Sequence, residues 1–336
     1  MSVPPQTVLI TGCSSGFGAL MSRTLAAAGH RVFAGMRDIA SKNAEAARTL
    51  RAWADEHGAR LDVVEIDVTD HASVDAAVGT MLDKAGRIDV AVNNAGRAAR
   101  GPMEAFSEAQ VQALFDLNVF GPMRVNKAVL PAMRAQRSGL IVHVSSTIGR
   151  VMPGFGSIYG ATKWALEGVA ESLHYEVRGF GIDVVILEPG VFATTVMSKV
   201  MVAEDTAISE AYAAAAASVT PPMNRAAPWT LQLPDPQGMA TALKQVVELP
   251  LGQRPLRMVV GSIFTEGVAE YNEAYEVASR RLVASLRGGN LKKGYRLWAI
   301  GYRENTHMLA CRLRSRSVFY LWPIAHSPWP SRRGDQ

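Results

Sequence analysis

The sequence is poor in cysteine and contains no long apolar run. Cys13 and Cys311 are the only two cysteines among 336 residues, so neither a disulfide framework nor a cysteine metal site is expected. No stretch approaches the run of about 18 apolar residues that suggests a membrane-spanning helix. The first residues, Met1 to Pro5, lack the charged and apolar regions of a signal peptide. These absences predict a soluble, cytoplasmic protein.

Net charge is small except at the C-terminal end of the chain. The whole sequence carries +5, but residues 287–336 contain ten Lys/Arg and two Asp/Glu. The preceding 286 residues contain 25 basic and 28 acidic side chains and are therefore mildly acidic. We expect no binding of nucleic acid or membrane by this body. The tail is predicted to be poorly ordered, and binding of anionic lipid or nucleic acid by the tail is the alternative.

Alternating apolar and helical segments predict the fold class. Strands are expected at residues 7–10, 31–35, 61–66, 88–92, 140–144 and 182–187, and helices at 19–28, 41–57, 71–85, 107–136 and 159–178. This order is typical of an α/β protein with a doubly wound parallel sheet of the Rossmann type and helices on both faces. A helix at 237–247, a strand at 257–260 and a helix at 265–286 follow. We expect one domain over residues 1–286 and an extension over 287–336.

A glycine-rich turn follows the first predicted strand. Thr11-Gly12-Cys13-Ser14-Ser15-Gly16-Phe17-Gly18 stands between that strand and a helix. Gly12 permits a tight turn, while Gly16 and Gly18 allow a pyrophosphate to approach the backbone at the helix N-terminus. The alternative is a glycine-rich turn without a ligand.

The end of the second predicted strand bears on the choice of dinucleotide. Met36 cannot bind the ribose hydroxyls of NAD, whereas the guanidinium of Arg37 can pair with the extra phosphate of NADP. Asp38 lies one position further on. The sequence therefore favours NADP over NAD, unless Arg37 is only a solvated loop residue.

Tyr159 and Lys163 lie four residues apart in a predicted helix. Positions i and i+4 share one helical face, so the ammonium can lie close to the phenol. A phenol has a pKa of about 10, and a nearby cation is expected to lower this pKa, which suits a general acid and base.

Five motifs occur in one order along the chain. They are Thr11-Gly-x-x-x-Gly-x-Gly18, Asn93-Asn-Ala-Gly96, a serine thirteen residues before the tyrosine, Tyr159-x-x-x-Lys163, and Pro189-Gly190. Over about Thr7 to Leu286 the chain closely resembles the short-chain dehydrogenase/reductase family, in its single-domain oxidoreductase subclass. Residues 34–38 and 171–173 are most similar to the branch that includes the 17-beta-hydroxysteroid dehydrogenases.

The resemblance implies a four-residue catalytic set. Tyr159 would be the acid and base at the substrate oxygen, and Lys163 would lower the pKa of Tyr159 and bind the nicotinamide ribose. Ser146 would hydrogen-bond the substrate oxygen, and Asn118 would hold a water in a proton relay. No metal is implied.

The resemblance also implies which residues bind the cofactor. Ser15 and Arg37 would meet the 2′-phosphate, Asp67 and Val68 the adenine, Asn94 to Gly96 the adenosine side, and Pro189 to Thr194 the nicotinamide. The full expected set is Gly12, Ser15, Gly16, Phe17, Gly18, Arg37, Asp67, Val68, Asn94, Ala95, Gly96, Tyr159, Lys163, Pro189, Gly190 and Thr194.

A substrate lid is predicted over about residues 191–235, with a helix through the alanine run 211–217. Its methionines, which include Met197, Met201 and Met223, are apolar and adaptable, unless they are ordinary core residues. Together with Ser146 and Tyr159, the expected substrate-binding residues are Met152, Phe155, Phe192 and Met197. A bulky hydrophobic alcohol or carbonyl compound is the expected substrate. Arg97 and Arg100 leave an anionic or acyl-thioester substrate as the alternative.

The sequence thus predicts an NADP(H)-dependent oxidoreductase that interconverts an alcohol and its ketone or aldehyde. The resemblance implies a homodimer or homotetramer. Three other classes stay open: an epimerase or dehydratase with the same Tyr-Lys pair, a non-catalytic NADP-binding regulator, and a membrane or nucleic-acid binder that acts through its tail.

Overall fold

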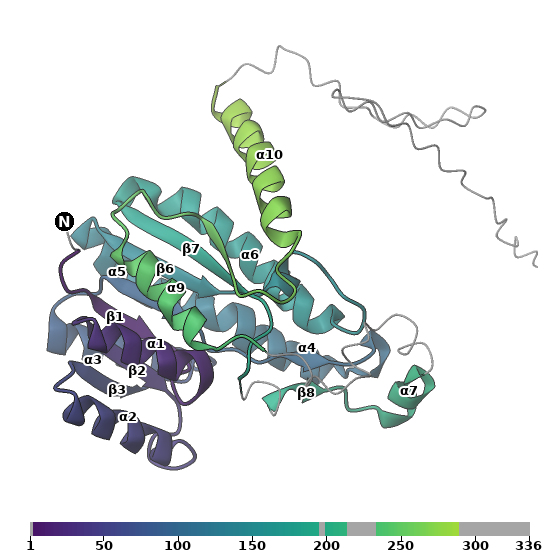
Figure 1. The fold of residues 1–336 in the computed structure, drawn as a ribbon, viewed down its shortest axis with the longest axis horizontal. Coiled ribbons are helices and arrows are strands. Elements are labelled where there is room, and N and C mark those ends of the chain that lie inside the picture. The colour runs from purple at the N-terminus through teal and green to yellow at the C-terminus, as the bar shows by residue number, and fades with distance from the viewer. Residues whose placement is uncertain (1–2, 195–198, 214–232, 289–336) are drawn as a thin grey trace, which may run out of the picture. The chain divides into compact units, whose positions relative to one another are not determined.

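A seven-stranded parallel sheet forms the centre of the structure, a computed structural model that describes residues 3–194, 199–213 and 233–288 (Figure 1). The strand order is β3-β2-β1-β4-β6-β7-β9. Their bounds are β1 Thr7–Ile10, β2 Arg31–Met36, β3 Leu61–Glu65, β4 Val90–Asn93, β6 Gly139–Val144, β7 Ile182–Pro189 and β9 Arg257–Val260. The order changes direction at β1, which pairs with β2 on one side and β4 on the other. The predicted fold class, a doubly wound Rossmann-type sheet, is confirmed.

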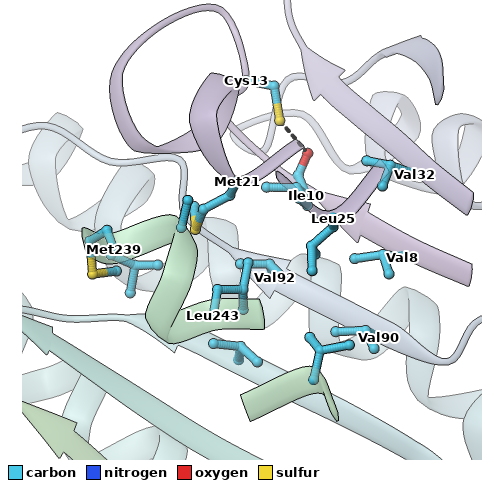
Figure 2. Packing of buried hydrophobic residues seen from close by; sticks show 14 of the residues in the cluster. Val8, Ile10, Cys13, Met21, Leu25, Val32, Val90, Val92, Met239 and Leu243 are labelled. Carbon is cyan, nitrogen blue, oxygen red and sulfur yellow. Dashed lines mark hydrogen bonds between the residues drawn. The ribbon is translucent and has the colours of Figure 1, made fainter. Parts of the chain in front are cut away.

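Alternate residues of the strands point to opposite faces and bury two separate cores. Val8 and Ile10 pack with α1, α2 and α9 on one face, whereas Leu9 packs with α3, α5 and α6 on the other. These helices are α1 Gly16–Ala27, α2 Ala44–Glu56, α3 His71–Ala85, α5 Gly121–Gln136, α6 Ser157–Val177 and α9 Gln237–Glu248. Figure 2 shows Met21 and Leu25 of α1 meeting Met239 and Leu243 of α9 above β1 and β4.

The helix predicted over residues 107–136 is interrupted. It consists of α4 Glu108–Phe115, a π-helical turn Asp116–Phe120, and α5 Gly121–Gln136. Pro122 has no N–H to donate to the carbonyl four residues earlier, which explains why α-helical bonding breaks here. The wider turn holds Asn118, which the structure buries at 1% exposure.

Four short elements lie outside the predicted alternation. β5 Ala99–Arg100 pairs in parallel with β8 Met201–Val202, and the 3-10 turns Met103–Ala105 and Thr147–Gly149 follow β5 and β6. Such two- or three-residue elements carry too little periodicity to be predicted. A further 3-10 turn, Arg178–Phe180, ends α6.

The C-terminal part differs from the prediction in its helix bounds. α7 covers Thr206–Ala211, so it ends where the predicted alanine helix begins, and residues 214–232 lie outside the described part. α10 covers Val268–Gly288, so it includes Arg287 and Gly288, where a break was expected. The chain divides into two compact units at residues 282 and 283. In the described ranges, no helix has the length and apolar character to cross a membrane.

Candidate active site

The carboxyl ends of the parallel strands bring the predicted motifs to one edge of the sheet. The glycine-rich turn follows β1, Asn94 to Gly96 follow β4, and Ser146 follows β6. Pro189 ends β7, and Gly190 comes next. This edge is where parallel α/β sheets bind their ligands.

Two glycines of the first turn are required by space as well as by conformation. Gly12 has φ +75°, and a Cβ there would lie 2.8 Å from the Cα of Ala95. A Cβ on Gly18 would lie 2.3 Å from the carbonyl oxygen of Gly12. Any larger residue at either position would therefore push apart the turn that starts α1.

A pair of polar side chains joins the glycine-rich turn to the turn after β4. The hydroxyl of Thr11 accepts hydrogen bonds from the backbone N–H groups of Asn94 and Ala95, both at 3.0 Å. The side-chain amide of Asn94 donates to the carbonyl of Thr11 at 2.8 Å. Asn94 thus braces the turn, a structural task that does not depend on a ligand.

The N-terminus of α1 has the features of an anion site. Ser15 is the N-cap residue, its side chain makes no capping hydrogen bond, and the first turn of α1 contains no acidic residue. The partial positive charge of the helix N-terminus is therefore not neutralised by a nearby carboxylate of the helix. Lys199 adds a cation, since its Nζ donates to the Ser15 hydroxyl at 2.7 Å. These residues fit the pyrophosphate and phosphate groups of a dinucleotide.

Met36, at the end of β2, is 2% exposed and presents no carboxylate. The side chain of Arg37 is 53% exposed, and its Nη1 lies 3.4 Å from a carboxylate oxygen of Asp67. Burial acts to raise the pKa of Asp67, but hydrogen bonds from Thr69 and the charge of Arg37 outweigh it and hold this pKa below its usual value. A second carboxylate, that of Asp38, lies 3.8 Å from Arg37 Nε. Arg37 is thus accessible, with two weak partners to exchange for a phosphate.

Tyr159 lies in the first turn of α6 and faces Ser146. The Ser146 side chain is close enough to act on the pKa of the Tyr159 phenol, and the Ser146 hydroxyl accepts from the N–H of Ile148 at 3.3 Å. Ser146 is 8% exposed. A substrate oxygen at this point would meet two hydroxyl groups, of which one can move a proton.

Lys163 lies beneath the tyrosine ring. Its Nζ donates to the carbonyl of Val144 at 2.9 Å and lies 5.8 Å from the centroid of the Tyr159 ring. Burial lowers the pKa of Lys163 to about 8, against the opposing effect of the Glu167 carboxylate. The predicted pairing of ammonium and tyrosine on one helical face is therefore present.

The expected lowering of the phenol pKa is absent. Burial raises the pKa of Tyr159 to about 12, although the hydrogen bond with Ser146 acts to lower it. The physical reason is the position of the ammonium, which bonds Val144 and contacts the ring, not the hydroxyl. The expectation from helical spacing alone was wrong.

Asn118 is held inside the protein and does not point to solvent. Its Oδ1 accepts from the N–H of Arg97, and its Nδ2 donates to the Arg97 carbonyl, both at 2.9 Å. The same Nδ2 lies 3.0 Å from the hydroxyl of Thr162 on α6. A Cβ on Gly96 would lie 3.1 Å from Asn118 Oδ1 and 3.8 Å from Lys163 Nζ. Asn118 and Lys163 therefore flank the same backbone turn.

The other predicted cofactor residues lie along the same edge, with structural contacts of their own. The side chain of Val68 is 5% exposed and packs against the backbone of Gly121. Gly190 donates its N–H to the carbonyl of Val260 at 2.9 Å, and Thr194 donates its N–H to the carbonyl of Phe192 at 2.9 Å.

One predicted substrate residue lies elsewhere. The side chain of Phe192 is 5% exposed and belongs to the core beneath α1 and α9. It packs edge-on against Phe17, with ring centroids 5.4 Å apart. The prediction that Phe192 lines the substrate pocket is therefore corrected. Its aromatic side chain packs in the core of the protein.

The predicted substrate residues Met152 and Phe155 lie in the segment that precedes α6. The thioether of Met152 packs over Gly160, where a Cβ would lie 2.2 Å from the sulfur. The ring of Phe155 lies edge-on to Tyr212, with centroids 6.4 Å apart. Met152 remains 43% exposed and can contact a ligand. Met197 lies outside the described residues.

The position of Lys199 was not predicted from the sequence. It contacts Ser15, which lies 184 positions earlier, and the carbonyl of Lys199 accepts from Arg97 Nε at 2.8 Å. A lysine in a loop of mixed composition gives no signal of such a long-range contact. Arg97, in turn, uses part of its guanidinium within the protein.

The fold and this edge define an α/β protein of the Rossmann type. The chain matches the short chain dehydrogenase family over residues 6–205. It belongs to this family of oxidoreductases, which confirms the resemblance carried by the motifs.

The relatives include the branch that residues 34–38 and 171–173 resemble. Human retinol dehydrogenase 8 is 40% identical over 205 residues, which are 60% of this chain and 63% of that protein. Human 17-beta-hydroxysteroid dehydrogenase type 1 is 39% identical over 199 residues, 58% of this chain and 59% of that protein. The alignments thus cover less than two thirds of the length of these two relatives.

Solved structures share the fold over more of the chain. A short-chain dehydrogenase from Streptomyces avermitilis has a TM-score of 0.67 and 31% identity, and the match covers 85% of this chain and 98% of that one. The gluconate 5-dehydrogenase of Burkholderia cenocepacia, in complex with NADP and tartrate, has a TM-score of 0.61 and 26% identity. That match covers 77% of this chain and 94% of the other.

Proposed function

We propose that this protein is an NADP(H)-dependent oxidoreductase that interconverts an alcohol and its ketone or aldehyde. The observation that carries the proposal is the contact of Tyr159 with Ser146 above the buried ammonium of Lys163. A proton donor, a hydrogen-bonding hydroxyl and a buried cation thus surround one point at the ligand-binding edge of the sheet. Proton transfer to a carbonyl oxygen needs such a set.

Gly12, Gly16, Gly18 and the N-terminus of α1 would hold the pyrophosphate of the cofactor, and Arg37, Ser15 and Lys199 its 2′-phosphate. When bound, the nicotinamide supplies or accepts the hydride. The absence of a carboxylate at Met36 and the exposure of Arg37 support NADP over NAD. The NADP complex of the related gluconate 5-dehydrogenase gives independent support.

In the direction of reduction, Tyr159 would give its phenolic proton to the substrate oxygen while Ser146 donates a hydrogen bond to it. The ammonium of Lys163 would stabilise the phenolate that Tyr159 then becomes. Asn118 would hold the turn at Gly96 and the start of α6, through Arg97 and Thr162, so that Lys163 keeps its place. In the direction of oxidation each proton moves the opposite way.

A bulky hydrophobic substrate is proposed because the segment before Tyr159 is apolar: Met152 packs over Gly160, the residue after Tyr159, and Phe155 precedes α6. Each methylene group buried there contributes about 0.8 kcal/mol. Arg97, which would have favoured an anionic substrate, donates its Nε–H to the backbone carbonyl of Lys199 within the protein. An acyl-thioester substrate therefore has less support than a neutral, apolar one.

The direct test is NADPH oxidation by the full chain with graded ketones and aldehydes, small sugars and acyl thioesters. We expect the highest kcat/KM on large apolar carbonyl compounds. Met152→Ser should raise the KM for these substrates, whereas Leu251→Ser should not, because Leu251 is 54% exposed and lies near Gly181, before the start of β7 and so at the opposite end of that strand from Pro189. No turnover of any carbonyl compound, with NADPH bound, would favour a non-catalytic regulator.

A further inference from the structure

A buried cluster of charged and polar side chains lies around Glu167, one turn of α6 after Lys163. Its members are Arg150, Glu167, Glu188, Arg257 and Asn272, which we call the Arg150–Asn272 cluster. Glu167 is one turn after Lys163 on α6 and is 2% exposed, and Glu188 is fully buried near the end of β7. Asn272 comes from α10 and is partly buried.

Arg257 connects β9 to α6. Its Nε donates to Glu167 at 2.9 Å and its Nη2 to Glu171 at 2.7 Å. The same Nε lies 3.6 Å from Glu188 Oε1. These contacts of Arg257 leave the other oxygen of Glu188, Oε2, to a different partner.

Asn272 is that partner. Its Nδ2 donates to Glu188 Oε2 at 2.5 Å, and its Oδ1 accepts from Arg150 Nε at 2.7 Å. The direct separation of Arg150 Nε and Glu188 Oε1 is 3.9 Å, too long for a hydrogen bond. The amide of Asn272 therefore joins the buried guanidinium of Arg150 to the buried carboxyl group of Glu188, and these two groups do not hydrogen-bond each other.

The two groups belong to the segments on which the reaction depends. Arg150 follows Ser146 by four residues. Its backbone N–H donates to the carbonyl of Thr147 at 3.0 Å and so closes the 3-10 turn. Glu188 directly precedes Pro189-Gly190. Asn272 therefore fixes, from outside the sheet, the segment that carries the substrate-facing serine and the segment expected at the nicotinamide.

Two tyrosines of α10 shield this contact. The rings of Tyr271 and Tyr275 lie over the guanidinium of Arg150, with centroids 4.8 and 4.5 Å from its carbon. Burial and then the charge of Glu167 raise the pKa of Glu188 to about 8, while Asn272, Arg257 and Arg150 act to lower it. A hydrogen bond in such surroundings is strong, and the loss of one partner is costly.

We propose that Asn272 is a positioning residue of the oxidoreductase reaction, which holds Ser146 and Pro189-Gly190 in register through Arg150 and Glu188. This inference rests on the proposed function and extends it to α10, which contributes no residue to the predicted site. Arg150, Glu188 and Asn272 act as one clamp between α10 and two strand ends.

Asn272→Leu keeps the size of the side chain and removes both hydrogen bonds. We expect kcat/KM to fall about 10- to 100-fold, since a small misplacement of reacting groups has effects of this size. The fall should lie mainly in kcat, while the Kd for NADPH changes less than about threefold. Ser279→Ala is the matched control: Ser279 also belongs to α10 and bonds Glu171 at 3.0 Å, without touching Arg150 or Glu188.

Asn272→Asp should keep the kcat of the parent at low pH and lose it at high pH. Its carboxyl group can still accept from Arg150, and it can bond Glu188 while the two carboxyl groups share a proton. The charged groups that face this pair are Glu167, Arg257 and Arg150, with Lys163 beyond Glu167. Two adjacent carboxylates cannot both remain ionised without repulsion. We expect the ratio of variant to parent kcat to be near one at about pH 6 and to fall as the pH rises toward about 9.

Hydrogen exchange measures the clamp itself. In Asn272→Leu the amides of Gly149, Arg150 and Gly190 should exchange faster than in the parent, and in Ser279→Ala they should not. Unchanged exchange, a similar loss of kcat in the Ser279 control, or a pH-independent Asn272→Asp ratio would each overturn the proposal. If the parent turns over no carbonyl compound, the proposed function fails, whereas the exchange experiment still decides whether the clamp exists.

Discussion

Lys199 and Ser15 are hydrogen-bonded across 2.7 Å, although 184 positions separate them in the sequence. This contact puts an exposed ammonium at the N-terminus of α1, where the backbone N–H groups already favour an anion. Two sources of positive charge therefore lie at the point where the sequence predicts a phosphate of the cofactor.

Replacement of Lys199 should consequently weaken binding of NADP(H). For Lys199→Ala we expect Kd for NADPH to rise about 3- to 10-fold, the effect of one exposed charged hydrogen bond, and Kd for NADH to change less. Isothermal titration measures both. Lys244→Ala is the control, because Lys244 pairs with Glu248 on α9; an equal effect of the two substitutions would assign the loss to net charge alone.

Arg37 should decide the choice between the two dinucleotides. Arg37→Ala removes a guanidinium whose only ion-pair partners among the described residues are Asp67 and Asp38. Loss of a charge-assisted contact costs about 1.5–3 kcal/mol, so NADP binding should weaken roughly 10- to 150-fold while NAD binding stays nearly unchanged. The same titration applied to both cofactors tests this. Equal losses would place Arg37 away from the 2′-phosphate.

Replacement of glycine by alanine should have opposite effects at Gly18 and Gly79. Gly18→Ala would put a methyl group 2.3 Å from the carbonyl oxygen of Gly12, so we expect loss of both stability and cofactor affinity. Gly79→Ala, inside α3 with no atom within 4 Å of the new Cβ, should stabilise the protein by about 0.5–1 kcal/mol. Urea unfolding of both variants is the measurement, and a stable Gly18→Ala protein that binds NADPH normally would contradict the role of the turn.

Some features of the fold and the site could be predicted from the sequence, and others could not. The alternation of strands and helices, the glycine-rich turn and the Tyr159–Lys163 pair could be predicted because each is a local pattern in the sequence. Parallel topology then brings the strand ends to one edge without further information. The spacing of Ser146 and Tyr159 needed the family resemblance as well, since Ser145 and Ser146 stand side by side in the sequence.

The features that could not be predicted from the sequence depend on contacts between segments that are distant in the chain. Phe192 looks like a pocket residue in the sequence and is a core residue, because the approach of Phe17 in α1 decides its surroundings. Asn272 looks like an ordinary polar residue of a terminal helix. Its two buried partners, Arg150 and Glu188, lie 122 and 84 positions away, and no periodicity records such a pairing.

The buried carboxyl group of Glu188 should make stability fall with rising pH. Its pKa is raised to about 8 in the folded protein, so between about pH 4.5 and pH 8 the folded state binds more protons than the unfolded state. The contribution of this group is present below its unfolded pKa and is lost as the pH rises through about 8.

Glu188→Gln isolates that effect. The amide keeps a hydrogen-bond acceptor for Asn272 but cannot ionise, so the unfolding free energy of the variant should decline less between about pH 5 and pH 8 than that of the parent. His30, His143 and His174, whose pKa values are lowered mainly by burial, contribute to both proteins and cancel in the comparison. Identical pH dependence of the two unfolding curves would show that Glu188 titrates at an ordinary pH.

The measurement that tests the proposed chemistry most directly is the turnover number of Tyr159→Phe, on a carbonyl compound that the parent reduces with NADPH. Phenylalanine keeps the ring that Lys163 contacts and removes only the proton that the substrate oxygen needs. We expect kcat to fall by at least about 100-fold, the usual contribution of general acid catalysis, with the Kd for NADPH nearly unchanged. Tyr175→Phe, on the same helix, should keep the activity of the parent. A Tyr159→Phe protein that turns over at a near-normal rate would contradict the assignment of Tyr159 as the proton donor.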